Sequence, residues 1–356
     1  MAKSIPVLEG VTASRQIPLQ ETSLEIWDSK YRLKSKDGAP IDGSIDETYQ
    51  RVARALAAQE REPDTWYEPF LWALRNGAIP AGRITSNAGA FEHKPATSTI
   101  NCTVSGTIED SMDDILGKVH EAGLTLKAGC GIGYDFSTLR PRGAFVSGAG
   151  AYTSGPLSFM DIYDKMCFTV SSAGGRRGAQ MGTMDIRHPD VVEFIQAKRE
   201  DGRLRQFNLS LLITEEFVSA VKEDAPWQLI FPYTAKEVEQ DGIALDDPAR
   251  VVWADWPNKE GVVINELGQV ACKVYKTLPA RKLWNVIMTS TYDYAEPGFI
   301  LIDKVNQMNN NWFCEEIRAT NPAFFKIVVA QSCFKQPLFA PARVSRAAPD
   351  LASRHR

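Results

Sequence analysis

A run of glycines around residue 130 is the feature of this sequence whose residue types best suit ligand binding. Gly129, Gly131 and Gly133 stand at alternate positions, and Cys130 lies between the first two. Glycines leave backbone N–H groups uncovered, so a ligand can approach the main chain closely. These glycines precede an apolar strand and lack the G-x-G-x-x-G spacing, which excludes a nicotinamide dinucleotide site.

Two other segments combine small residues with groups that could bind a phosphate. Residues 80–89 place Thr85 and Ser86 between glycines and could offer N–H and O–H donors, although a surface turn is the alternative interpretation. Residues 171–182 contain a glycine- and arginine-rich stretch that predicts a mobile, cationic loop able to change shape. Its central residues are Gly174, Gly175, Arg176, Arg177 and Gly178. From residue types alone, this loop is either a phosphate site or a solvated turn.

Cys102, which follows Asn101 in a short polar strand, is either a redox thiol or a small buried side chain. A reversible dithiol needs a second cysteine within bonding distance. The six cysteines, at positions 102, 130, 167, 272, 314 and 333, are scattered and include no C-x-x-C pair. They indicate neither a secreted disulfide framework nor a zinc site. The four histidines show no partner pattern for a metal site or a catalytic triad.

Composition narrows the function classes. A chain of 356 residues can bury a large core and predicts about two domains. A net charge of -4 and a pI near 5.7 argue against a general nucleic-acid surface. No apolar run reaches the length of about 18 residues that a membrane span needs, and the first 20 residues show no secretory pattern. We therefore expect a cytoplasmic protein without a membrane partner.

The order of the predicted elements suggests how these segments are positioned. Helical spacing of apolar residues over 47–60 and 64–77, the second capped by Asp64, predicts a small helical N-terminal domain. Asp110 and Ser111 begin a further helix, and N-capping alone would explain them. From about residue 79, short strands alternate with helices, which predicts a parallel sheet, open or closed into a barrel. The strands are expected at 132–136, 181–186, 206–213, 229–231 and 298–302, and the helices at 156–170, 189–198, after Thr214, and 280–294.

Taken together and in order, these segments resemble ribonucleotide reductases of the adenosylcobalamin-dependent class. The matching stretches are residues 80–89, 98–104, 109–112, 128–137, 139–143, 171–182, 188–190, 207–210 and 316–322. The resemblance covers about residues 23–322. It implies a helical N-terminal domain followed by a barrel of ten strands in two halves, with a catalytic loop threaded through the middle. Residues 1–90 and 91–322 would be the helical domain and the first half of that α/β barrel.

The resemblance also implies roles for particular residues. Cys102 would belong to the redox pair that supplies reducing equivalents, and Asn321 would hydrogen-bond near the ribose. The substrate would lie against Thr85, Ser86, Asn101, Gly129, Cys130 and Gly131. A deoxynucleotide or ATP effector would bind at Asp110 and Ser111. The specificity elements that respond to it would contain Arg140, Arg142 and residues 174–178. No metal ligands are implied.

In that family, adenosylcobalamin generates a thiyl radical on a cysteine directly after the Asn-Pro pair. The radical removes the 3′ hydrogen of the ribonucleotide, and the 2′ hydroxyl leaves as water. Electrons then come from a dithiol that a thioredoxin-type protein or a small dithiol regenerates. The family resemblance further implies a homodimer, and it leaves diphosphate and triphosphate substrates open.

This sequence departs from the family after Pro322. Where the family has Cys-Gly-Glu, it has Ala323-Phe324-Phe325, and residues 323–356 look like an unrelated tail without a fold of its own. We therefore predict a barrel truncated before the catalytic loop and a chain that is inactive alone. A half-barrel would leave an open sheet edge that calls for a partner. The alternatives are a nucleotide-binding fragment without catalysis and one half of a split reductase completed by a second polypeptide.

Overall fold

The computed structural model describes residues 18–94, 97–146, 148–170, 178–199 and 203–322. The chain divides into two compact units. Unit 1 comprises residues 1–102, 126–131 and 170–178, and unit 2 comprises residues 103–125, 132–169 and 179–356. Two predicted features, the tail at 323–356 and residues 174–177 of the arginine-rich loop, lie outside the described residues.

Unit 1 is helical, as its apolar spacing predicts. Its helices are α1 (Glu21–Ile26), the π-helical turn η1 (Trp27–Tyr31), α2 (Ile45–Ala57), α3 (Pro63–Arg75) and α4 (Gly82–Asn87). The Ser44 hydroxyl caps α2 by accepting a hydrogen bond from the Glu47 N–H at 3.3 Å. Helices α2 and α3 pack together through buried Val52, Ala53 and Leu71. The two predicted N-terminal helices are thus confirmed.

Two local predictions in unit 1 are wrong. Helix α3 begins at Pro63, so Asp64 lies inside its first turn and is not the cap. Proline suits the first helical position because its fixed φ is already helical and its missing N–H would be unpaired there. The second error is at residues 82–87, where a loop was expected and the chain forms α4. The backbone donors of α4 are used locally, since the N–H groups of Ile84 and Thr85 both bond the Ala81 carbonyl.

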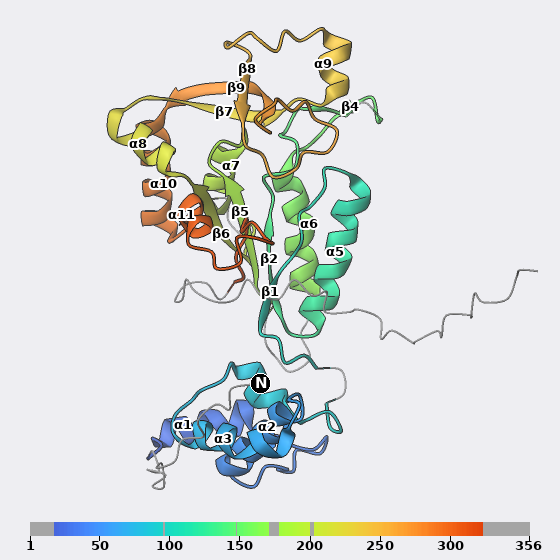
Figure 1. Ribbon diagram of the computed structural model, residues 1–356, viewed down its shortest axis with the longest axis vertical. Helices are drawn as coiled ribbons and strands as arrows, with labels where there is room; N and C mark the ends of the chain where they lie inside the picture. The colour runs from blue at the N-terminus through green and yellow to red at the C-terminus, as the bar shows by residue number, and fades with distance from the viewer. Residues whose placement is uncertain (1–17, 95–96, 147, 171–177, 200–202, 323–356) are drawn as a thin grey trace, which may run out of the picture. The chain divides into compact units, whose positions relative to one another are not determined.

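Unit 2 is organised around a five-stranded sheet in the order β1-β2-β5-β6-β10. The strands are β1 (Cys102–Val104), β2 (Gly131–Asp135), β5 (Gln180–Asp185), β6 (Phe207–Ile213) and β10 (Gly298–Leu301). The β2–β5, β5–β6 and β6–β10 pairs are parallel. The predicted strands near 132, 181, 206 and 298 are confirmed, and the parallel sheet matches a partial α/β barrel (Figure 1).

Helices connect the strands and cover the sheet (Figure 1). They are α5 (Met112–Lys127), α6 (Pro156–Thr169), α7 (Val191–Gln196) with the 3-10 turn η2 (Ala197–Arg199), α8 (Glu215–Glu223), α10 (Ala280–Tyr294) and α11 (Ile302–Gln307). Thr214 caps α8 as predicted, because its hydroxyl accepts from the Phe217 N–H at 3.3 Å. Under α6, the rings of Tyr134, Tyr163 and Phe136 pack with centroids 5.0 to 5.6 Å apart.

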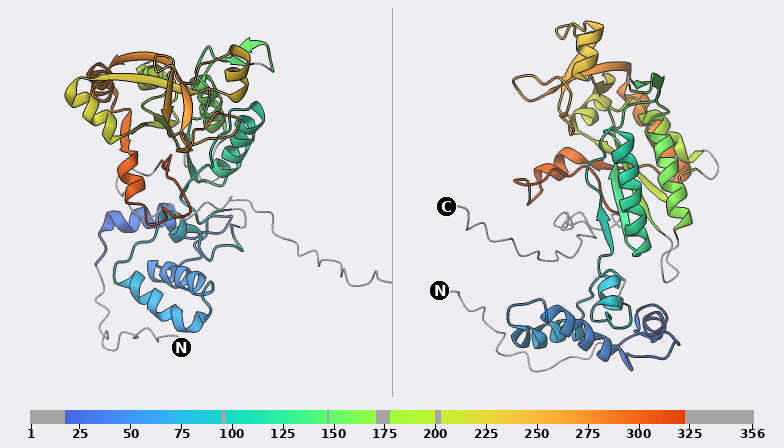
Figure 2. Two further views of the ribbon diagram at one scale, coloured as in Figure 1. Left: turned by 45° about the horizontal axis from the view of Figure 1, so that its top comes forward. Right: turned by 90° about the vertical axis from the view of Figure 1, so that its right-hand side faces the viewer.

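A second, antiparallel sheet was not predicted. The segment expected as a further parallel strand is β7 (Pro226–Pro232), and it pairs antiparallel with β9 (Val270–Pro279), which also pairs with β8 (Val251–Ala254). Figure 2 shows these strands with α9 (Ala235–Asp241) at one end of unit 2. A small hairpin, β3 (Phe145–Val146) and β4 (Ala151–Tyr152), completes the unit. In the described part of the chain, no helix has both the length and the apolar character to cross a membrane.

Candidate functional site

The central strands of unit 2 carry most of their polar residues on one face. Tyr134 and Gln180 turn toward α6, where the Tyr134 hydroxyl lies 3.0 Å from the Gln180 side-chain oxygen and the Gln180 amide donates to the Tyr163 carbonyl at 3.1 Å. Because side chains alternate along a strand, their neighbours point the other way. We call this opposite side the inner face. Its polar residues are Asp135, Thr183, Asp185, Asn208 and Ser210, and Gly133, Met181 and Leu212 lie on the same face.

The stretch singled out from the sequence, residues 316–322, lies on this inner face; we call it the Asn321 segment. The Thr183 hydroxyl lies 2.9 Å from the Arg318 carbonyl, and the Asn208 amide donates to the Pro322 carbonyl at 3.4 Å. Asn306 holds the start of the segment through two hydrogen bonds to Ile317. Its side-chain oxygen accepts from the Ile317 N–H at 2.7 Å, and its side-chain nitrogen donates to the Ile317 carbonyl at 2.9 Å. Two strands, β5 and β6, and helix α11 therefore position the segment that contains Asn321.

Gly133 allows the closest approach between the Asn321 segment and the sheet. A Cβ at this position would lie 1.8 Å from the Thr320 carbonyl oxygen and 2.8 Å from its carbon. Any side chain would collide with the main chain of the segment, so glycine is required by contact and not by a turn. Asn321 itself is buried, with 8% of its surface exposed. Close packing at Gly133 is therefore part of what fixes Asn321.

Arg318 anchors the segment electrostatically. Its guanidinium lies 3.1 Å from the Asp135 carboxylate and 3.4 Å from that of Asp185. Asp185 also accepts two hydrogen bonds from Arg187, at 3.0 and 2.9 Å. Burial alone would raise the pKa of Asp185, but Arg187 and then Arg318 hold it well below its usual range. The carboxyl ends of β2 and β5 thus form a charged clamp on the segment.

Sequence reasoning placed Gly133 in the glycine run but did not single out Asp135, Asp185 or Arg318 as site residues. A signal was present in the strands themselves. Central strands of parallel sheets are normally apolar on both faces, because helices or other strands cover both. Asp135, Thr183, Asp185, Asn208 and Ser210 interrupt these apolar strands on one face, and they mark a face that serves something other than packing.

Of the residues predicted to serve the effector, Asp110 and Arg140 contact each other, whereas Arg142 does not join them. The Asp110 carboxylate accepts two hydrogen bonds from Arg140, one from the side-chain Nε at 2.6 Å and one from the backbone N–H at 3.2 Å. Burial raises the pKa of Asp110, although Arg140 acts in the opposite direction. Ser111 has the capping role considered from the sequence, since its hydroxyl accepts from the Asp114 N–H at 3.2 Å at the start of α5. Asp110 and Arg140 therefore form a half-buried ion pair, and the Asp110 carboxylate in it is only partly solvated.

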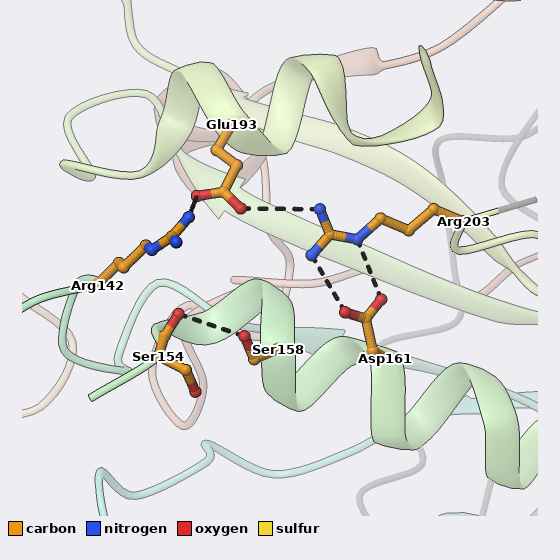
Figure 3. A pocket seen from close by; sticks show the side chains of 6 residues that line it. All are labelled: Arg142, Ser154, Ser158, Asp161, Glu193 and Arg203. Atoms are coloured by element: carbon orange, nitrogen blue, oxygen red, sulfur yellow. Dashed lines mark hydrogen bonds and ion pairs between the residues drawn. The ribbon is translucent and has the colours of Figure 1, made fainter. Parts of the chain in front are cut away.

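Arg142 lies apart from that pair, in an open cavity of about 590 Å³ (Figure 3). The cavity is lined by Arg142, Ser154, Ser158, Asp161, Glu193 and Arg203. Arg203 bridges α6 and α7, with nitrogens 3.1 Å from Asp161 and 3.7 Å from Glu193. The Arg142 side chain is 69% exposed and reaches Glu193 only at 3.9 Å. Of the two arginines that line the cavity, Arg142 is the more exposed and is therefore better placed to bind a ligand.

The predicted substrate residues lie in unit 1, where four of them adjoin one another. The Gly131 N–H donates to the Asn101 carbonyl at 3.1 Å, and the Cys130 thiol donates to the Ile100 carbonyl at 2.8 Å. Gly129 accepts from the Arg83 guanidinium at 2.7 Å, which ties the glycine run to α4. Thr85 and Ser86 lie on α4 itself, and Ser86 is buried. Cys102, next to Asn101, is half-buried, and Gly178 stands two residues before the start of β5.

The remaining reactive side chains have structural roles. His188 is buried, its Nε2 lies 2.9 Å from the Leu139 carbonyl and its Nδ1 accepts from the Asp190 N–H at 3.0 Å. Burial lowers the pKa of His188. Its role is therefore local packing, the interpretation that the sequence favours. Across the described ranges, no three His, Cys, Asp or Glu side chains gather closely enough to hold a metal ion.

Comparison with known proteins assigns the chain to a family. Residues 18–91 match the model of the ribonucleotide reductase all-alpha domain, and residues 100–325 match that of the ribonucleotide reductase barrel domain. The chain is 31% identical over 314 residues to a vitamin B12-dependent ribonucleoside-diphosphate reductase of Mycobacterium tuberculosis (strain CDC 1551 / Oshkosh), covering 86% of this chain and 39% of that protein.

Two further relatives are similar. A protein of the same name from Thermoplasma acidophilum is 26% identical, covering 87% of this chain and 37% of the relative. The ribonucleoside-diphosphate reductase subunit alpha of Helicobacter pylori (strain ATCC 700392 / 26695) is 28% identical, covering 82% of this chain and 35% of the relative. The chain spans between a third and two fifths of the length of these relatives. Because the barrel-domain match covers most of the chain, the protein belongs to the ribonucleotide reductase large-subunit family.

Proposed function

We propose that the complete enzyme reduces ribonucleotides to 2′-deoxyribonucleotides in the cytoplasm, and that this chain supplies its helical domain and the first half of its barrel. The observation that carries the proposal is the Asn321 segment, held on the polar inner face by Thr183, Asn208 and Arg318. A buried amide next to such a face suits hydrogen bonding to a ribose hydroxyl. The ranges matched by the two family models support a domain division near residue 90.

Each remaining role is proposed from position and residue type. Cys102, half-buried in β1, would be one thiol of the dithiol that supplies electrons, with a thioredoxin-type protein or a small dithiol as the external reductant. Asn101, Gly129, Cys130 and Gly131 would line the substrate. The names of the relatives support a nucleoside diphosphate as the substrate class.

Adenosylcobalamin is the cofactor that the relatives' names suggest. The residues of this chain do not fit its chemistry, because Ala323 stands where the resemblance requires a thiol. Cys314, seven residues before Asn321, is exposed, and its thiol lies 3.5 Å from the Asn311 carbonyl in a separate turn. Within the described residues, no cysteine therefore stands where the family places the reactive thiol, and a second polypeptide beginning near Cys-Gly-Glu would supply it.

The test is a nucleotide reduction assay on the purified chain with adenosylcobalamin, a deoxynucleotide effector and a small dithiol. We expect no deoxynucleotide from the chain alone and product once the Cys-Gly-Glu polypeptide is added. Product from the chain alone would mean that Cys314 or Cys333 replaces the missing thiol. Effector binding without product in either assay would favour the alternative, a nucleotide-binding fragment without catalysis.

The Asp110–Arg140 pair is proposed to bind the sugar of a deoxynucleotide or ATP effector, with Arg142 and residues 174–178 responding to it. An incompletely solvated carboxylate is a strong acceptor for a sugar hydroxyl. Asp110→Asn should lower effector affinity about tenfold or more, because a hydrogen bond to a charged group contributes about 1.5–3 kcal/mol. Calorimetric titration with a deoxynucleoside triphosphate measures this. Asp113→Asn, at an exposed position in the first turn of α5, is the matched control, and equal affinities for the two variants would contradict the assignment.

Self-association through α5 and α6 is proposed as the basis of a homodimer. Both helices expose apolar side chains, with Met112 54% and Leu116 48% exposed on α5, and Ile162 42% and Phe168 67% exposed on α6. The two helices lie side by side in both views of unit 2 (Figures 1 and 2). An exposed apolar patch of this kind is typical of an interface.

A further inference from the structure

An asparagine between two strands of the second sheet reaches the segment that carries the proposed effector carboxylate. Asn258 lies on the connection between β8 and β9, and its side-chain nitrogen donates to the Glu109 carboxylate across 149 positions of sequence. Its side-chain oxygen accepts from the Glu260 N–H at 2.9 Å, which leaves the nitrogen for Glu109. Because Asp110 follows Glu109 directly, Asn258 holds the residue next to the proposed effector site.

The main chain around Glu109 is held on both sides. The Thr138 hydroxyl donates to the Ile108 carbonyl at 2.7 Å, and the Glu109 N–H donates to the Asp114 carboxylate at 2.7 Å. Since this main chain is already ordered, the contact with Asn258 costs little further conformational entropy. A movement of Asn258 is therefore transmitted to the effector segment, by which we mean residues 108–110.

The same connection meets the charged clamp three residues earlier in the chain. The Asp255 carbonyl accepts from the Arg187 Nη2 at 3.3 Å, and the Arg187 guanidinium lies 5.7 Å from the centre of the Trp256 ring. Trp256 is buried, with 4% of its surface exposed, and its ring centre lies 5.5 Å from that of Phe231. The position of Arg187 is therefore set in part by Asp255 and Trp256.

Arg187 joins this connection to the Asn321 segment. Its guanidinium donates two hydrogen bonds to Asp185, at 3.0 and 2.9 Å, and the same carboxylate lies 3.4 Å from Arg318. Asp185 is buried, so a displaced Arg187 would leave its charge only partly paired. Residues 255–258, which we call the Trp256 link, therefore lie between the clamp and the effector segment.

We propose that the Trp256 link holds the effector segment and the clamp in register, so that a nucleotide bound at Asp110 strengthens the hold on the Asn321 segment. This inference rests on the proposed function, because it adds a route of regulation to the proposed effector site, separate from residues 174–178. Asn258 and Arg187 are the positioning residues at the two ends of the link. Closely packed side chains have few alternative arrangements, which is why a contact at one end can bias the other.

The test follows amide hydrogen exchange of residues 317–321 in the full chain, with and without each of the four deoxynucleoside triphosphates. In wild type, a nucleotide that binds should slow this exchange about fivefold or more. Asn258→Ala should abolish the slowing at saturating nucleotide, because the link is released from Glu109. Glu109→Gln keeps an oxygen to which the Asn258 amide can donate and should retain the slowing, whereas Glu109→Ala should lose it.

Asn265→Ala is the matched control, because it removes the same side-chain amide from the same connection. Asn265 contacts its own turn, with its side-chain nitrogen 3.2 Å from the Gln269 oxygen and its oxygen accepting from the Leu267 N–H at 3.0 Å. This variant should show the wild-type slowing. Full slowing in Asn258→Ala would overturn the proposal, as would a bound nucleotide that leaves exchange at residues 317–321 unchanged in wild type.

Failure of the proposed function is a separate result, in which none of the four nucleotides binds to the wild-type chain. The nucleotide-free variants then decide the inference. Release of Asn258 should let Arg187 shift from Asp185, so residues 317–321 should exchange about fivefold faster in Asn258→Ala than in Asn265→Ala. Equal exchange in these two nucleotide-free variants would refute the link.

Discussion

Gly133→Ala should release the Asn321 segment from the inner face of the sheet. The added methyl carbon would lie 1.8 Å from the Thr320 carbonyl oxygen, which belongs to the main chain and cannot rotate away. Either the segment or β2 must shift, and overpacking of this kind costs about 1–3 kcal/mol, with main-chain collisions at the upper end. Chemical denaturation should therefore show a loss of about 3 kcal/mol. Amide hydrogens of residues 317–321 should exchange faster, because the contacts of the segment with Thr183, Asn208 and Asn306 are lost.

Gly117→Ala is the matched control for this substitution. Gly117 lies within α5, and a Cβ there would meet no atom within 4 Å. Alanine is favoured over glycine in a helix by about 1 kcal/mol, so this variant should be as stable as wild type or slightly more stable. If Gly133→Ala matched Gly117→Ala in both stability and exchange, the close approach of the segment to β2 would be refuted.

Arg318→Met should lower stability by about 3–5 kcal/mol, because it leaves charge buried without its partner. Asp185 would keep Arg187, but Asp135 would lose its guanidinium at 3.1 Å. Arg318→Lys should recover part of the loss, since it restores the charge but cannot reach both carboxylates with a planar fork. Arg281→Met is the control, because Arg281 is 51% exposed and its pair with Asp224 at 3.8 Å should contribute less than about 1 kcal/mol.

The deficit of Arg318→Met should depend on pH. The pKa of Asp185 is lowered in the folded protein, so its stabilising effect is present above the unfolded value of about 3.9 and is lost as the pH falls toward the folded value. Because Arg318 contributes to that lowering, Arg318→Met should lose less folding stability than wild type as the pH falls. The gap between wild type and Arg318→Met should therefore be widest near neutral pH and narrow below about pH 4. A gap that stays constant from pH 7 to pH 3 would show that Arg318 acts through packing alone.

Local sequence signals determined a large part of this structure. The apolar period in residues 45–57 and the serine before it specify α2, and Thr214 specifies the start of α8. The glycine run that leads into β2 and the order of the motifs were enough to indicate the reductase family. These features depend on neighbours within a few residues, which is why spacing and residue type reveal them. The second sheet was missed because β7 and β9 are paired across 37 intervening residues that carry no local signal of the pairing.

The tertiary structure alone decided which residues serve the Asn321 segment. Arg318 meets Asp135 and Asp185 across 183 and 133 positions of sequence, and Gly133 meets the main chain of Thr320. In unit 1, residues 82–87 became a helix, so Thr85 and Ser86 lie on α4 and not on a loop. Residue types by themselves determined the family and the position of the Asn321 segment in the chain. The contacts that hold this segment arise only when parallel strands bring their polar faces together, because alternation sets which way a side chain points but not what it meets.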